Sequence, residues 1–125
     1  MSITFHSVIP ILRIFDVSKA EEFYRDYLGF KTDWDHRFED GLPLYRQVSR
    51  GGLVLHLSEH HGDGSPGVHV RIDMTGISEF HAELKTKNYR YMKPGLDDQN
   101  SPSGRREMTV IDPFGNQLTF VEKEQ

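Results

Sequence analysis

Histidine, carboxylate and arginine side chains on predicted strands are the groups in this sequence best suited to chemistry. His56 lies between Leu55 and Leu57, so its imidazole faces away from the leucine row, which should pack on a helix. Histidine shuttles protons near neutral pH and is a common metal ligand. We therefore treat His56 as a ligand contact, with a hydrogen-bonded structural role as the alternative.

Arg13, Arg71 and His69 share the corresponding face of paired strands, where they would neutralise an acidic ligand. In the alternative, Glu107 and Glu122 balance these groups in an ion-pair network, and we favour this structural role for the two arginines. An acid–base pair of His56 with Glu107 is a further option, but sequence spacing alone does not place the two side chains within reach.

Aromatic residues form the second group of candidates. Trp34, Phe38 and Tyr45 fall in or between two predicted strands, and flat rings there would clamp a planar ligand. The net charge of −4 favours a cationic partner, through steering and cation–π contact. The alternative is that these rings are ordinary sheet or dimer-interface residues. Carboxylates near the rings in sequence are Asp33, Asp35, Glu39 and Asp40.

Length and composition limit the classes of protein. The 125 residues suit a single domain, the charge gives little attraction to nucleic acid or an anionic membrane, and the absence of cysteine excludes disulfides and thiolate chemistry. No apolar run approaches the roughly 20 residues of a membrane span, and the N-terminus does not resemble a signal peptide, so we expect a cytoplasmic protein. The sequence has no phosphate-binding glycine loop, zinc-protease helix or nucleophile elbow.

The elements that must position these residues alternate between strand and helix patterns. A strand is predicted over 9–14, with Pro10 marking an edge or strand end. A helix follows, capped by Asp16 or by Ser18 with Glu21 in a capping box, and Gly29 ends it. Its predicted apolar stripe is Ala20, Phe23, Tyr24, Tyr27 and Leu28. Strands are then predicted over 30–38, 44–50 and 53–58, the last two joined by a Gly-Gly hairpin.

The second half repeats this order. Alternating residues 68–73 predict a strand, a helix should end near Asn88, and strands are predicted over 89–93, 107–111 and 117–122, with a polar loop over 96–104. An Asp precedes a helical Phe by seven residues in both halves, at Asp16 and at Asp73. The pattern favours an internal duplication: one α+β domain over 1–125, made of βαβββ modules at 6–59 and 67–123.

Two phrases carry a family resemblance. The segment from Asp16 to Phe30, with Phe23-Tyr24 and Leu28-Gly29, and the late segment Asp112-Pro113-Phe114-Gly115-Asn116 look like the hallmarks of the glyoxalase/bleomycin-resistance, or vicinal oxygen chelate, superfamily. Within it, the sequence looks closest to bleomycin-resistance-type binding proteins. The resemblance implies two βαβββ modules whose curled mixed sheet forms a cleft, usually completed in a homodimer, with a metal site in enzymatic members.

The positions that bind metal in enzymes of this superfamily map here to Ile9, His56, Gly67 and Thr119. Only His56 is a metal-binding residue type, whereas a catalytic divalent ion normally needs about three protein ligands. We therefore interpret this metal site as lost. A rearranged site of His56 and His69 with Glu107 or Glu122 is the alternative.

Taken together, the residues and the resemblance favour a binding protein of the bleomycin-resistance type that sequesters its ligand without turnover and needs no cofactor. The predicted ligand is a small molecule, cationic and aromatic like bleomycin, held by a homodimer. One alternative is a divalent-metal glyoxalase- or dioxygenase-like enzyme with an atypical ligand set, and another is a metal-free relative that binds a different metabolite. Predicted ligand-binding residues are Trp34, Phe38, Tyr45, His56, His69, Arg71 and Glu107.

Overall fold

The computed structural model describes residues 2–87, 89, 91–96 and 105–123. In chain order, the first half holds β1 (Ile11–Arg13), α1 (Val17–Ala20), η1 (Glu21–Tyr27), β2 (Lys31–His36), β3 (Tyr45–Arg50) and β4 (Leu53–Ser58). The second half holds β5 (His69–Asp73), α2 (Ile77–Thr86), β6 (Arg105–Ile111) and β7 (Gln117–Lys123). Among the described helices, none is long and apolar enough to cross a membrane.

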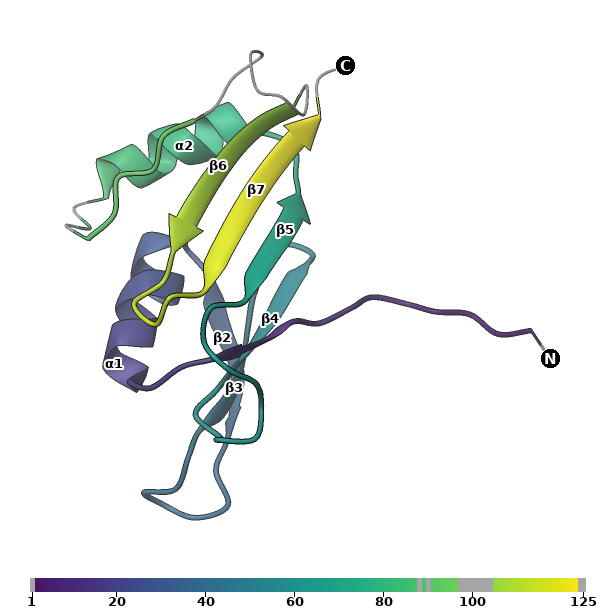
Figure 1. The fold of residues 1–125 in the computed structure, drawn as a ribbon, viewed down its shortest axis with the longest axis vertical. Helices are drawn as coiled ribbons and strands as arrows, with labels where there is room; N and C mark the ends of the chain where they lie inside the picture. Colours follow the sequence, from purple (N-terminus) through teal and green to yellow (C-terminus); the bar gives the residue numbers. More distant parts are fainter. Residues whose placement is uncertain (1, 88, 90, 97–104, 124–125) are drawn as a thin grey trace.

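The strands divide between two sheets, one for each half of the chain (Figure 1). The first has the order β1-β4-β3-β2 and the second β5-β7-β6. In both, the leading strand pairs in parallel with the last strand of its unit, and the other pairs are antiparallel. The helices lie on the same side of the molecule in Figure 1. This repeated, mixed arrangement confirms the predicted α+β fold class.

The first helix begins and ends where the sequence predicts. Asp16 is the N-cap and its carboxylate accepts a hydrogen bond from Lys19 N at 2.9 Å, so the cap is Asp16 and not the Ser18–Glu21 box. The helix widens into the π-helical turns of η1, and Gly29, with a φ of 80°, turns the chain into β2. The predicted apolar stripe is buried in the core throughout.

The second half differs from its prediction in one element. No strand forms at the described residues of the segment 89–93, which are Tyr89, Tyr91, Met92 and Lys93. Position 90 lies outside the described residues, as do position 88 and residues 97–104 of the predicted loop. Tyr89 instead stacks on the Tyr27 ring of η1, with ring centroids 4.6 Å apart. Side-chain packing between the two halves therefore replaces strand pairing here, which the alternating pattern of residues does not reveal.

The two phrases that carry the family resemblance meet in the core. Tyr24 in η1 donates from its hydroxyl to Asp112 Oδ2 at 2.6 Å, although 88 residues separate them. Asp112 also accepts from the backbone N–H groups of Phe114 and Asn116, and Asn116 Nδ2 donates to Arg13 O in β1. The late turn is thus bonded to both the first helix and the first strand, and it joins the two halves.

Residues 2–9 form an arm that extends away from the body of the molecule (Figure 1). The predicted strand over 9–14 is shortened to β1, although Pro10 O still accepts from His56 N at 3.0 Å. Three apolar side chains of the arm are almost fully exposed, namely Ile3, Phe5 and Val8. An isolated chain would gain little stability from ordering these three residues, because their side chains bury almost no apolar surface there.

Candidate functional site

Three of the predicted ligand-binding residues meet on one face of the first sheet, and we call this set, Trp34, Tyr45 and His56, the aromatic face. The strand register aligns Trp34 with Gln47 and Gln47 with His56, so their side chains project from the same side of β2, β3 and β4. The rings of Trp34 and Tyr45 are nearly parallel, at 13° and 6.0 Å between centroids, while His56 stands edge-on to both. Trp34 is 43% exposed, so a planar ligand can reach it.

Both ring nitrogens of His56 are engaged on this face. Its Nδ1 lies 2.6 Å from the Tyr45 hydroxyl and its Nε2 lies 3.0 Å from Gln47 Oε1. Gln47 Nε2 in turn donates to Asp33 Oδ2 at 3.0 Å. Burial, followed by the nearby Asp63 carboxylate, raises the pKa of Tyr45, so its phenol stays protonated at neutral pH. His56 therefore has the hydrogen bonds expected of the structural role weighed for it, and its contact with a ligand stays a prediction.

Phe38 lies outside this cluster. It is 77% exposed in the loop after β2, and its ring contacts His36 at 5.3 Å between centroids. Among the residues that the structure describes, no ring contact joins Phe38 to the aromatic face.

The remaining predicted residues lie together on the second sheet. His69 Nε2 is 2.7 Å from the Thr119 hydroxyl, which is 2.8 Å from that of Thr109. Arg71 donates to Glu107 Oε2 at 3.1 Å, so the ion pair favoured from the sequence is present. These groups project from the same side of β5, β6 and β7. Apart from Phe38, the predicted site is thus two separate sets, one on each sheet.

Two of the four carboxylates near the rings in sequence, Asp33 and Asp35, have structural partners. Asp35 forms a bidentate pair with Arg46, at 2.6 and 2.9 Å, which lowers the pKa of Asp35. Arg46 is only 8% exposed and also donates to Glu21 in η1 at 3.0 Å. Asp33 accepts from Gln47 and from Ser49, and these bonds lower its pKa as well. Its negative charge still lies beside the aromatic face.

The residues do not fit the metal site of the enzymatic superfamily members. Three of the four corresponding positions carry Ile9, Gly67 and Thr119, and a metal ion at His56 would break one of its two hydrogen bonds. The described residues contain no group of three or more histidine, aspartate or glutamate side chains suited to a metal ion.

The alternative metal set is also not assembled. Glu122 accepts from the backbone N–H groups of Gly76 and Ile77 at the start of α2, where it balances the helix dipole. Alternation along β7 places Glu122 on the face opposite Thr119, which is the contact of His69. His69 and Glu122 therefore point to different sides of the second sheet.

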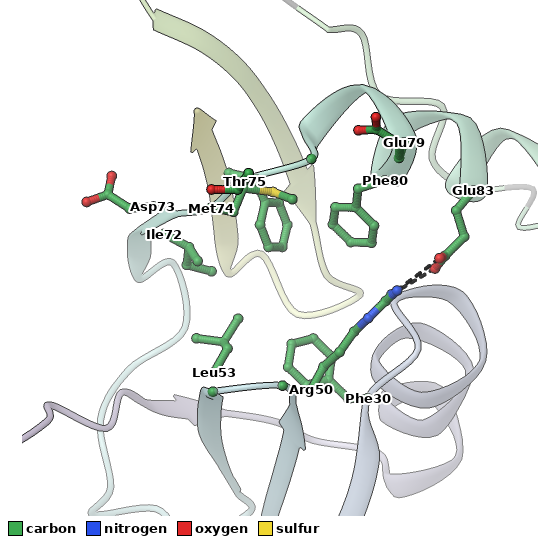
Figure 2. Close-up of a pocket in the computed structure, with 14 residues that line it drawn as sticks. Phe30, Arg50, Leu53, Ile72, Asp73, Met74, Thr75, Glu79, Phe80 and Glu83 are labelled. Atoms are coloured by element: carbon green, nitrogen blue, oxygen red, sulfur yellow. Dashed lines mark hydrogen bonds and ion pairs between the residues drawn. The ribbon is translucent and has the colours of Figure 1, made fainter. Parts of the chain in front are cut away.

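A pocket of about 800 Å³ between the two halves contains none of the predicted ligand-binding residues. Figure 2 shows Leu53, Ile72 and Phe80 around it, with Arg50 and Glu83 joined at one side. Arg50 Nη1 and Nη2 lie 2.7 and 2.9 Å from the Glu83 carboxylate, and Nη1 also donates to Leu28 O. The charges of Arg50 and Glu83 satisfy each other, whereas Asp73, Thr75 and Glu79 also line the pocket.

Sequence reasoning missed two contributors to these sites. Gln47 links Asp33 to His56, and its position two residues after Tyr45 on a predicted strand was a usable signal that both face the same way. The Arg50–Glu83 pair joins β3 to α2 across 33 residues, and no local pattern marks Glu83 as its partner.

The chain matches a family model described as a glyoxalase superfamily protein over residues 1–125. A comparison with curated proteins finds no match. Among solved structures, it is similar to a bleomycin-binding protein from bleomycin-producing Streptomyces verticillus, complexed with copper(II)-bleomycin, with 28% identity, a TM-score of 0.70 and coverage of 98% of this chain and 100% of the other.

Two further structures share the fold at lower identity. An antibiotic-binding protein from Streptomyces sp. CB03234 has 19% identity and a TM-score of 0.70, over 99% of each chain. A putative glyoxalase family protein from Bacillus anthracis has 19% identity and a TM-score of 0.66, over 99% of this chain and 100% of the other. Because the family model matches residues 1–125 of the chain, and these structures share its fold, the chain belongs to the glyoxalase superfamily.

Proposed function

We propose that this protein is a homodimeric small-molecule-binding protein of the bleomycin-resistance type, which protects by holding its ligand without turnover. The aromatic face carries the proposal. Trp34 and Tyr45 offer nearly parallel rings, one of them 43% exposed, on the side of the sheet away from the helices. Ring faces attract planar and cationic groups, and the Asp33 charge nearby favours a cation further.

The chemistry of the available donors favours binding over turnover. His56 is the only metal-binding residue type at the four superfamily positions, and its two nitrogens already bond Tyr45 and Gln47. His69 bonds a threonine hydroxyl and belongs to the other sheet. Catalysis by a divalent ion would need about three ligands from one place, which these residues do not supply.

Two observations support a homodimer. The exposed apolar side chains of arm residues 2–9 would bury their surface against a second copy of the chain. In addition, the predicted binding residues are divided between two sheets, and in a dimer the first sheet of one copy would face the second sheet of the other copy. Similar structures that hold bleomycin support this class of ligand at the level of fold.

The test is calorimetric titration of the purified protein with bleomycin, both metal-free and copper-loaded, together with metal analysis of the protein. We expect saturable binding of about one ligand per chain, unchanged after chelation and with the ligand recovered intact. Trp34→Ala should weaken binding without unfolding the protein, because the ring is partly exposed, and Phe38→Ala is the matched control outside the cluster. No binding of either form, together with a stoichiometric protein-bound metal, would refute the proposal.

A further inference from the structure

We propose that the hydrogen-bond chain Tyr45–His56–Gln47–Asp33 fixes the Tyr45 hydroxyl as an acceptor toward the ligand, so that the ligand carries an N–H or O–H donor at that position. This inference rests on the proposed function, because it places the ligand on the aromatic face. It adds a requirement for a hydrogen-bond donor on the ligand to the stacking of rings, and it makes Gln47 and His56 positioning residues for Tyr45.

The direction of the chain is set at Asp33. An ionised carboxylate only accepts hydrogen bonds, and the bonds from Gln47 and Ser49 hold the pKa of Asp33 below its ordinary value. The Gln47 atom that faces Asp33 must therefore be its amide nitrogen, 3.0 Å away. The amide cannot rotate by half a turn without bringing its oxygen against the carboxylate.

This orientation of Gln47 determines the proton on His56. The Gln47 carbonyl oxygen faces His56 Nε2 at 3.0 Å, so Nε2 carries the hydrogen and donates. In the neutral imidazole, Nδ1 is then a bare acceptor, and the Tyr45 hydroxyl 2.6 Å away donates to it. Each donor points along the chain from Tyr45 to Asp33.

The consequence appears at Tyr45, where the ligand would lie. A phenol has one proton, and this one is committed to His56, so the oxygen offers only lone pairs to a ligand. Other groups near the Tyr45 ring are His60, 6.4 Å away between ring centroids, and Asp63, whose carboxylate accepts from Ser58. The Asp63 charge disfavours an acceptor on the ligand further, and a ligand carbonyl or carboxylate at this point would face oxygen lone pairs.

The required ligand is therefore a planar ring system with a donor group at its edge, such as an amidinium or a carboxamide. A matched series of probes is naphthamidine, naphthamide and methyl naphthoate, which share one ring system, while only the first two have an N–H. One neutral hydrogen bond is worth about 1 kcal/mol, so we expect naphthamide to bind roughly fivefold more tightly than the ester. The amidine should bind at least as tightly as the amide.

Variants separate the hydroxyl from the ring. Tyr45→Phe keeps the ring, and the amide-to-ester affinity ratio should fall to about one. Gln47→Leu should lower the ratio as well, because His56 loses the group that fixes its proton. Trp34→Ala is the control, since it should weaken the probes to a similar extent and leave the ratio unchanged. Calorimetry or ligand-observed NMR gives these affinities.

A readout without ligand completes the test. Long-range ¹H–¹⁵N NMR should show the Nε2–H tautomer of the neutral His56 ring in the native protein and a mixture of tautomers in Gln47→Leu. An Nδ1–H form of His56, or an unchanged affinity ratio in Tyr45→Phe, would overturn the inference. If bleomycin binds but the probes show no donor preference, this inference alone fails; if neither bleomycin nor any probe binds, the proposed function fails with it.

Discussion

Tyr24 and Tyr27 offer a direct test of how the two halves are held together. Both side chains belong to η1 and are buried, at 1% and 2% exposed. The Tyr24 hydroxyl donates to Asp112 at 2.6 Å, whereas the Tyr27 hydroxyl has no hydrogen-bond partner within the described part of the chain. Replacing each by phenylalanine removes the same atom from two similar surroundings, so the difference between the variants reports the Tyr24–Asp112 bond.

The expected magnitudes follow from these partners. A hydrogen bond to a charged group contributes about 1.5–3 kcal/mol, and Asp112 keeps donors on both oxygens from Phe114 and Asn116, so Tyr24→Phe should lose about 1.5–2 kcal/mol. For a domain of this size that loss lowers the melting temperature by roughly 6–8 °C. Tyr27→Phe removes an unsatisfied buried hydroxyl, so its stability should stay the same or rise by up to about 1 kcal/mol.

Urea unfolding at neutral pH, followed by circular dichroism, measures both variants against the native protein. The native slope of free energy against urea concentration should be retained, because neither change alters the surface exposed on unfolding. Equal losses in the two variants would refute this reasoning, since they would show that loss of ring packing, and not the hydroxyl bond, sets the effect.

Three further outcomes are expected. Burial, and then Asp112, raise the pKa of Tyr24 above its ordinary 10.0, so its contribution to folding stability is complete below about pH 10 and is lost as the pH rises further. Urea unfolding at a series of pH values from about 8 to 11 should show a smaller loss of folding free energy in Tyr24→Phe than in the native protein. The hydrogen bond from Arg50 lowers the pKa of Glu83 below its ordinary 4.5, so the Glu83 carboxylate stabilises the fold above that pH, and this contribution is lost as the pH falls. Glu83→Gln should cost less than about 1 kcal/mol at pH 7, because both side chains are over a third exposed. Urea unfolding between neutral and acidic pH should show a smaller loss of stability on acidification in this variant than in the native protein. Deleting residues 2–9 should reduce the mass measured by light scattering from two chains to one, and a dimer that persists without the arm would contradict its proposed role.

Elements of regular structure were accessible from the sequence because local patterns determine them. An acidic N-cap, an apolar stripe at helical spacing and a terminal glycine located the first helix, and Gly51-Gly52 located the hairpin between β3 and β4. The repeated order of elements and the two family phrases indicated the fold. The strand predicted over 89–93 was wrong for its described residues, because Tyr89 packs against η1 and alternation alone does not distinguish packing from strand pairing.

Within the candidate site, the sequence predicted that His56, Trp34 and Tyr45 contact a ligand, and it determined that three of the four superfamily metal positions lack ligating side chains. Only the tertiary structure decided that Gln47 fixes His56, that Asp35 is neutralised by Arg46, and that Glu122 caps α2. Each of these is a contact between elements, set by strand register and by how helices lie on sheets. A hydrogen bond needs its two atoms about 3 Å apart, and that distance depends on the packing of the whole chain and not on the residues beside each partner.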